Sequence, residues 1–369
     1  MQHSKRLTRM ILKEIEASGG WISFTRYMEL ALYAPGLGYY SAGAEKFGGA
    51  GDFVTAPDMS SLFARCLAKQ ISQVLSITAG NILELGAGTG KLARDLLRDL
   101  EAQNVAPDRY FILEVSSELQ NRQQALIGML SKKLAQRVEW LDKLPQHFAG
   151  LVLANEVFDA LPVHVVAWRS RGIYEYGVTF ADGKFCWKER ALAQGELRNI
   201  ASGLRVPANY VSEIHLAARG LMRSLAALLD QGVILILDYG FGAAEYYHPQ
   251  RNRGTLMCHY RQQAHDDPFF LPGLQDITSH VNFSAIVESA GGLRLLGYTT
   301  QEHFLVNCGI TGILGKTAPD DAAYLPLASA AQKLLSPAEM GELFKVLALG
   351  KDISQRLIGF LSGDKSRLL

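Results

Sequence analysis

Residues 84–90 read Glu84-Leu85-Gly86-Ala87-Gly88-Thr89-Gly90 and follow the apolar pair Ile82 and Leu83. Behind them leucines recur at helical spacing, at Leu92, Leu96, Leu97 and Leu100. This order predicts a strand, a glycine turn and a helix whose first backbone N–H groups can face a ligand. Three glycines weaken a helix start unless something approaches the backbone, so we favour a ligand-binding turn over a purely structural one.

Two nucleotide-binding motifs are excluded at named positions. A dinucleotide-binding G-x-G-x-x-G turn would need glycine where Lys91 stands, and a P-loop would need glycine at Leu85 and a hydroxyl at Leu92. The remaining pattern, E-x-G-x-G-x-G, resembles motif I of class I S-adenosylmethionine-dependent methyltransferases. The resemblance implies that the cofactor contacts Glu84, Gly86, Ala87, Gly88, Thr89 and Gly90.

The alternation of apolar runs and helical patterns predicts a mostly parallel sheet. The expected strands cover residues 81–85, 109–115, 137–141, 150–155 and 232–239, and the last two are apolar throughout, as in strands that are buried on both faces. A late pair near 294–300 and 303–309 is expected to form an antiparallel ribbon at one edge. The predicted fold is therefore α/β, and the resemblance implies a Rossmann-like class I methyltransferase sheet, here with a helical N-terminal region and an inserted lobe.

The length of 369 residues allows additions to a single large domain. We expect a helical lid region over 1–80, a cofactor-binding domain over 81–320 and a C-terminal helical extension over 321–369. Insertions are expected near 165–200, where Asp182-Gly183 turns a β-hairpin, and near 240–282, where periodicity is weak.

Composition narrows the function classes. The net charge of +1 argues against a nucleic-acid partner, which would select a basic excess. The four cysteines are scattered without a C-x-x-C pair, so we expect no metal site and a cytoplasmic protein with reduced thiols. Apolar runs stay shorter than the roughly 20 residues of a membrane helix, so stable membrane insertion is not expected. The sequence neither predicts nor excludes a homodimer.

An acidic residue ends the second expected strand. Glu114 follows the apolar run 110–113, at a position where a carboxylate can accept hydrogen bonds from both ribose hydroxyls of a nucleoside. A solvated carboxylate at a strand end is the alternative. Val115 is predicted to contact the cofactor beside Glu114, whereas Trp140 could equally wall the adenine or belong to the core.

Strand four ends in Asn155-Glu156-Val157-Phe158-Asp159, which brings an amide and two acids to the edge where open α/β sheets bind ligands. An amide carbonyl followed by an aromatic suits an amino acceptor, and carboxylates suit a guanidinium with planar, paired donors. Asn155, Glu156 and Asp159 are therefore candidate catalytic residues, and Asn155 also a cofactor contact. Asp159 could instead cap the following turn.

Several strings together resemble the MidA family, which contains a mitochondrial complex I assembly factor that methylates a protein arginine. They are Met28-Glu29-Leu30-Ala31-Leu32-Tyr33, Gly38-Tyr39-Tyr40, Gly51-Asp52-Phe53-Val54-Thr55-Ala56-Pro57, the glycine turn, 155–162, Asp238-Tyr239-Gly240, Arg253-Gly254-Thr255-Leu256, Asp276-Ile277-Thr278, 280–283 and 340–345. The likeness spans nearly the whole chain in order. Asn282 departs from it, because many relatives are expected to have aspartate there.

The resemblance implies a protein arginine N-methyltransferase that uses S-adenosylmethionine. Its expected substrate is a complex I core subunit or a bacterial counterpart. Asp52, behind the small residues 48–51, is a further catalytic candidate from a closing loop, or a contact of the methionine part of the cofactor. An assembly or binding factor with a methyltransferase fold, and a small-amine methyltransferase, remain as alternatives.

Overall fold

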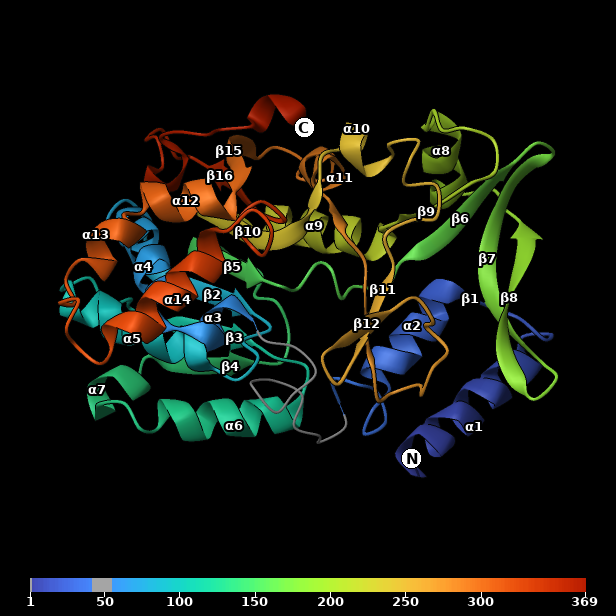
Figure 1. The fold of residues 1–369 in the computed structure, drawn as a ribbon, viewed down its shortest axis with the longest axis horizontal. Helices are drawn as coiled ribbons and strands as arrows, with labels where there is room; N and C mark the ends of the chain where they lie inside the picture. The colour runs from blue at the N-terminus through green and yellow to red at the C-terminus, as the bar shows by residue number, and fades with distance from the viewer. Residues whose placement is uncertain (1, 42–54) are drawn as a thin grey trace.

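The computed structural model describes residues 2–41 and 55–369. Its centre is a twisted sheet in the order β15-β16-β10-β5-β2-β3-β4, with β14 beside the end of β10 (Figure 1). The strands are β2 (Asn81–Leu85), β3 (Tyr110–Leu113), β4 (Val138–Leu141), β5 (Phe148–Asn155), β10 (Leu229–Phe241), β14 (Val281–Asn282), β15 (Arg294–Thr300) and β16 (Phe344–Lys351). β4, β3, β2, β5 and β10 run parallel, whereas β16 is antiparallel to both of its neighbours. The five predicted parallel strands and the α/β class are confirmed.

The predicted edge ribbon is half wrong. Residues 294–300 form β15, but the following segment is helix α12 (Gln301–Asn307), because Phe304, Leu305 and Cys308 recur at helical spacing and are buried. The Thr300 hydroxyl accepts a hydrogen bond from the His303 N–H and starts that helix. The antiparallel partner of β15 is β16, so residues 321–369 are not only a helical extension, as predicted, but complete the central sheet.

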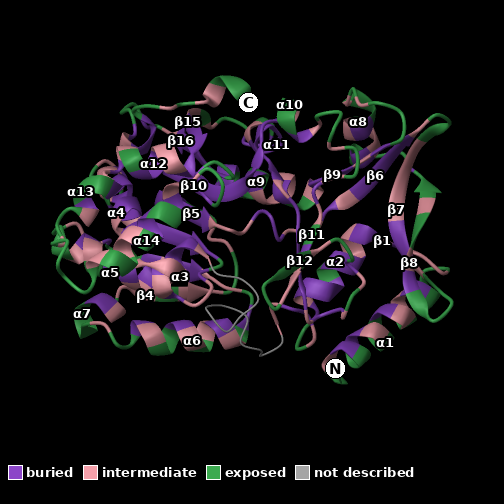
Figure 2. Ribbon diagram, in the orientation of Figure 1, coloured by how far each residue is buried: buried purple, intermediate pink, exposed green. Residues whose placement is uncertain are grey.

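Helices cover both faces of this sheet. One face carries α4 (Ser61–Leu75), α5 (Lys91–Ala102), α6 (Ser117–Ile127), α7 (Lys132–Ala135), α12, α13 (Ile310–Leu314) and α14 (Tyr324–Leu335). The other face carries α9 (Leu216–Leu228) and α11 (Phe283–Glu288). Along β5, Leu151 and Leu153 enter the first core while Val152 enters the second, which is the two-residue period of a strand buried on both faces. Figure 2 shows the central strands buried.

A second lobe is inserted between β5 and α9. It is built from β6 (His164–Arg169), β7 (Gly172–Ala181), β8 (Lys184–Ala191), α8 (Glu196–Gly203) and β9 (Tyr210–Ile214). The β7–β8 hairpin turns at Asp182-Gly183 as predicted. The chain's first elements pack onto this lobe: α1 (Gln2–Ala17), β1 (Ile22–Ser23) and α2 (Phe24–Tyr33). β1 adds a strand to β7.

The N-terminal region therefore has two separate positions. Its first elements join the inserted lobe, whereas α3 (Ala56–Met59) and α4 pack on the central sheet's side of the molecule. The weakly periodic segment after β10 forms α10 (Ala243–Tyr246) and a small sheet of β11 (Met257–Tyr260), β12 (Gln263–His265) and β13 (Asp276–Thr278) between the lobes (Figure 1). The chain closes with two 3-10 turns, Ile358–Phe360 and Ser366–Leu368. Within the described ranges, no helix is long and apolar enough to span a membrane.

Candidate active site

A cavity of about 650 Å³ lies between the lobes, at the carboxyl ends of β2, β3, β5 and β10. The sheet side supplies the glycine loop, the end of β3 and the loop after β5, whereas α2 with the turn after it and the small sheet supply the opposite wall. The predicted site residues in the described ranges that line it are Glu84, Gly86, Ala87, Gly88, Thr89, Glu114, Val115, Asn155, Glu156 and Asp159. The lining does not include Gly90, and Asp52 lies outside the described residues.

The glycine loop has the backbone geometry that only glycine adopts without strain. Gly86, Gly88 and Gly90 have φ values of +61°, +53° and +81°. A side chain at Gly90 would also meet Gln123, with Cβ 3.1 Å from Cγ, so this glycine serves packing below the loop. A Cβ at Gly88 would meet nothing within 4 Å, which leaves the backbone open to the cavity it lines.

Glu84 stands below this loop. It is buried on β2 and accepts a hydrogen bond from the Tyr110 hydroxyl at 2.8 Å. Burial raises the pKa of Glu84 to about 7, and the Tyr110 hydrogen bond opposes that rise.

Glu114 is fixed at the end of β3 by two donors. Its Oε1 accepts from the Ser116 N–H at 2.9 Å, and its Oε2 accepts from Nε2 of Gln123 at 3.0 Å. The same Nε2 donates to the Gly88 carbonyl at 3.0 Å, while Oε1 of Gln123 accepts from Trp140 Nε1 at 2.9 Å. Trp140 thus supports the site from behind through Gln123, and it is not among the residues that line the cavity. Burial raises the pKa of Glu114, and the two donors oppose the rise.

The loop after β5 presents two acids to the cavity. Glu156 has a left-handed backbone, with φ of +54°, which is uncommon outside glycine and typical of functional sites. The Asn155 amide donates to its carboxylate at 3.3 Å, and the Ala56 N–H also hydrogen-bonds it. Burial, followed by the nearby charge of Asp159, raises the pKa of Glu156 to about 8.

Asp238 on β10 holds this loop in place, a role that sequence reasoning did not assign. One of its oxygens accepts from the N–H groups of residues 157, 158 and 159, at 3.2, 2.9 and 3.3 Å. The other accepts from the Tyr239 N–H at 2.9 Å. Burial and the charges of Asp159 and Glu156 raise the pKa of Asp238, which the backbone donors oppose. Asp238 thus caps the backbone N–H groups of the loop that carries Glu156 and Asp159.

Asp159 is 4% exposed, and its two oxygens differ. Oδ2 accepts from the Tyr239 hydroxyl at 2.5 Å, whereas Oδ1 has no hydrogen-bond partner among the described residues. Burial raises the pKa of Asp159 to about 6, and the Tyr239 hydroxyl and the backbone N–H groups of Ala160 and Asp159 oppose the rise. A buried carboxylate oxygen without a donor is costly, and its place beside the cavity lets a bound group supply that donor.

Residues 55–59 pack on the glycine loop. Thr89 donates to Asp58 Oδ1 at 3.4 Å, and Thr55 donates to Oδ2 at 2.9 Å. Lys91 Nζ reaches the Pro57 carbonyl at 2.6 Å and Asp95 at 2.8 Å. Lys91, which excluded a dinucleotide-binding turn, thus anchors residues 55–59 beside the cavity.

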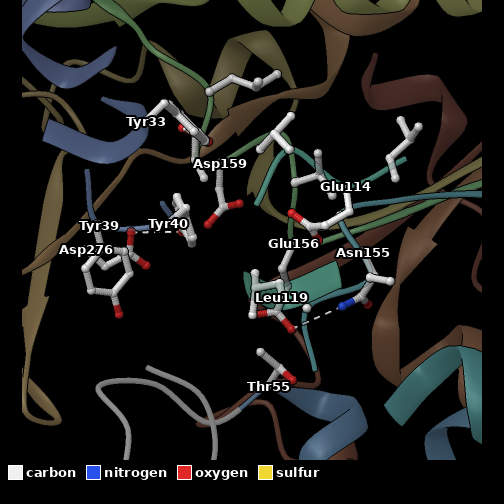
Figure 3. Close-up of a pocket in the computed structure, with 18 of the residues that line it drawn as sticks. Tyr33, Tyr39, Tyr40, Thr55, Glu114, Leu119, Asn155, Glu156, Asp159 and Asp276 are labelled. Carbon is white, nitrogen blue, oxygen red and sulfur yellow. Dashed lines mark hydrogen bonds between the residues drawn. The ribbon is translucent and has the colours of Figure 1, made fainter. Parts of the chain in front are cut away.

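The opposite wall was not predicted. Tyr33, Tyr40 and Asp276 line the cavity from α2, the turn after it and β13 (Figure 3). All three belong to strings that carried the family resemblance, but no local pattern indicated that they meet, because they come from segments about 240 residues apart in the chain. Asn282, the departure from the family pattern, caps α11 by accepting from the Ala285 N–H at 3.1 Å, which a neutral amide does as well as an aspartate.

The fold and this cavity define a class I methyltransferase. The sheet has the strand order of that class, with one antiparallel strand inserted beside β10. The open glycine loop and the carboxylate after β3 suit a nucleoside cofactor. Residues 62–299 match the family model of S-adenosyl-L-methionine-dependent methyltransferases.

Similar proteins from animals carry methyltransferase names. The chain is 28% identical to the mitochondrial protein arginine methyltransferase NDUFAF7 of Danio rerio, over 94% of this chain and 88% of the relative. It is also 28% identical to the Drosophila melanogaster homologue, over 90% and 82%. A crystal structure of a Burkholderia thailandensis protein bound to S-adenosyl-homocysteine is 49% identical and superposes with a TM-score of 0.96, covering 100% of this chain and 97% of that one.

This chain belongs to the MidA family of S-adenosylmethionine-dependent methyltransferases. The resemblance, the methyltransferase activity and the cofactor predicted from the sequence are thereby confirmed.

Proposed function

We propose that this enzyme methylates an arginine side chain of a partner protein. The observation that carries the proposal is the unpaired Oδ1 of Asp159, buried beside the cavity next to Glu156. A guanidinium offers planar N–H donors on neighbouring nitrogens, so it satisfies two carboxylates at once. The arginine methyltransferase names of the relatives support the same acceptor.

The cofactor residues of this proposal are those that line the sheet side of the cavity. Glu114 accepts the ribose hydroxyls, with Val115 beside it, and the backbone of 86–89 faces the rest of the cofactor. Asn155 stands between this part and the acids. When bound, S-adenosylmethionine supplies an electrophilic methyl group on a sulfonium.

Glu156 and Asp159 orient the acceptor. A guanidinium has a pKa of about 12.5–13.8 and is charged at neutral pH, so its attacking nitrogen must be made nucleophilic in place. Two carboxylates on its N–H groups localise the positive charge away from that nitrogen. As the new N–C bond forms and the bond from that carbon to sulfur breaks, the nitrogen loses a proton, which Glu156 accepts because its raised pKa of about 8 suits a base near neutral pH.

The partner is proposed on family grounds. The resemblance implies a respiratory complex I core subunit or a bacterial counterpart, and an opening between two lobes fits a polypeptide better than a sealed pocket would.

The test uses an extract from cells that lack this protein. The extract is incubated with the purified enzyme and labelled S-adenosylmethionine, and the labelled residue is mapped by mass spectrometry, with Glu156→Gln enzyme as the matched control. We expect label on arginine with wild-type enzyme only. Label on lysine, a carboxyl group or a small amine would overturn the arginine assignment. Cofactor binding without any label would favour the assembly-factor alternative.

A further inference from the structure

The wall opposite the acids has an aromatic surface. The rings of Tyr33 and Tyr40 stack with centroids 5.5 Å apart and an angle of 26° between their planes. Tyr39 packs edge-on against Tyr40, with centroids 5.1 Å apart at 78°. All three tyrosines line the cavity, and Figure 3 shows Tyr40 between Asp159 and Asp276.

Both stacked rings are held at their hydroxyl ends. Tyr40 donates to Oδ1 of Asp276 at 2.9 Å, which joins the turn after α2 to β13. Tyr33 donates to the carbonyl of Ala160 at 3.0 Å, which joins α2 to the loop that carries the acids. With their hydroxyls engaged, the tyrosines offer the cavity mainly the faces and edges of their rings.

The surrounding charge is negative. Asp159 and Asp276 both act on Tyr33 and Tyr40, and with burial, the largest cause, they raise the pKa of each phenol. The phenols therefore stay neutral, and the wall combines aromatic rings with carboxylates. A planar cation is the ligand class that such a wall suits, because a guanidinium stacks on aromatic faces while its N–H groups reach acids at its edge.

We propose that Tyr33 and Tyr40 form a platform on which the acceptor's guanidinium stacks, with Asp159 Oδ1 accepting from its edge. Asp276 is a positioning residue, because it acts by holding the Tyr40 ring. This inference rests on the proposed function and adds the subsite by which the cation is recognised. It also gives a role to two additions, the N-terminal elements and the segment after β10, since both supply the platform.

Binding of two small probes tests the platform without turnover. Nα-acetyl-arginine N-methylamide and its neutral citrulline counterpart are titrated into enzyme loaded with S-adenosylhomocysteine, by calorimetry or ligand-observed NMR. Wild-type enzyme should bind the arginine probe about tenfold more tightly or better, from charged hydrogen bonds and ring stacking together. Tyr40→Leu should weaken arginine binding by about fivefold and leave citrulline binding and cofactor affinity almost unchanged.

Further variants keep the test decisive. Tyr40→Phe retains the ring and should keep at least half of the preference for arginine, and Asp276→Asn, which keeps an oxygen that can accept from the Tyr40 hydroxyl, should keep at least as much. Tyr174→Leu, the same change in the inserted lobe away from the cavity, is the matched control. Equal binding of both probes to wild-type enzyme would overturn the platform, as would full preference in Tyr40→Leu or its complete loss in Tyr40→Phe.

The two proposals fail separately. An intact preference for the arginine probe with label mapped to another residue type in extract refutes the proposed acceptor alone. Arginine label with no effect of Tyr40→Leu refutes the platform alone.

Discussion

Replacing Gln123 by methionine should weaken cofactor binding although Gln123 does not line the cavity. Gln123 is fully buried, and its amide joins Glu114, the Gly88 carbonyl and Trp140 by hydrogen bonds of 3.0, 3.0 and 2.9 Å. Methionine has a similar length and no donor, so Glu114 loses its side-chain donor and keeps backbone N–H groups as its partners.

The magnitude follows from these contacts. Loss of one hydrogen bond to a charged acceptor is worth about 1.5–3 kcal/mol, and part of it returns because Glu114 borders the cavity and can take water. We therefore expect a loss of about 1–2 kcal/mol in binding free energy, which is about 5- to 30-fold in Kd. Trp140→Phe, which removes the donor behind Gln123 and keeps an aromatic ring, should have a smaller effect.

Titration calorimetry with S-adenosylmethionine over a pH series is the assay. Gln123 opposes the burial that raises the pKa of Glu114, so its removal raises that pKa further. Because the ionised carboxylate accepts the ribose hydroxyls, affinity in the variant should begin to fall at a higher pH than in wild-type enzyme as the solution is acidified. An unchanged Kd together with an unchanged pH profile would refute the positioning role.

The remaining predictions concern the acids. Glu114→Ala should weaken cofactor binding by about 1.5–3 kcal/mol in the same calorimetric assay, and an unaltered Kd would remove Glu114 from the site. Glu156→Gln and Asp159→Asn should lower turnover far more than cofactor affinity, and near wild-type rates in both would make these acids structural. In wild-type enzyme, kcat/KM should rise with pH through the raised pKa values of about 6 for Asp159 and about 8 for Glu156, because only the ionised acids attract the cation. Glu156→Gln should remove the rise near pH 8. The pKa of Glu156 in the folded protein lies above its ordinary value, so the wild-type carboxyl destabilises the fold increasingly from about pH 4.5 to about 8. Glu156→Gln should therefore raise Tm more at pH 8 than at pH 5. An equal change in Tm at both pH values would contradict this prediction.

Much of the sheet could be predicted because its information is local. Apolar runs such as 232–239 and the turn at 84–90 specify strand and loop by the residues they contain. The partner of β15 could not be found in this way, because an antiparallel strand forms wherever a distant apolar segment fits the open edge. The apolar segment after β15 was close at hand but had helical spacing.

Sequence reasoning likewise found the sheet side of the candidate site and missed its opposite wall. Motif residues on the sheet side lie together at strand ends, which a parallel sheet guarantees. The tyrosine wall depends on how two lobes pack, and Tyr40 meets Asp276 across 236 positions of chain. Asp238 stands in one of the strings that carry the family resemblance, but nothing local shows that its carboxylate accepts from the N–H groups of the loop after another strand.

The position of β16 has a consequence for how the chain reaches its folded state. Because this late strand lies between β10 and β15, neither has its neighbour on that side until residues 344–351 have been synthesised. Until then β10 presents an apolar edge of unpaired backbone groups, the kind of surface on which other chains aggregate. A chain that stops before Phe344 thus leaves this edge of β10 open. Chaperones would need to cover that open edge before the enzyme could bind its cofactor at the carboxyl ends of the same strands.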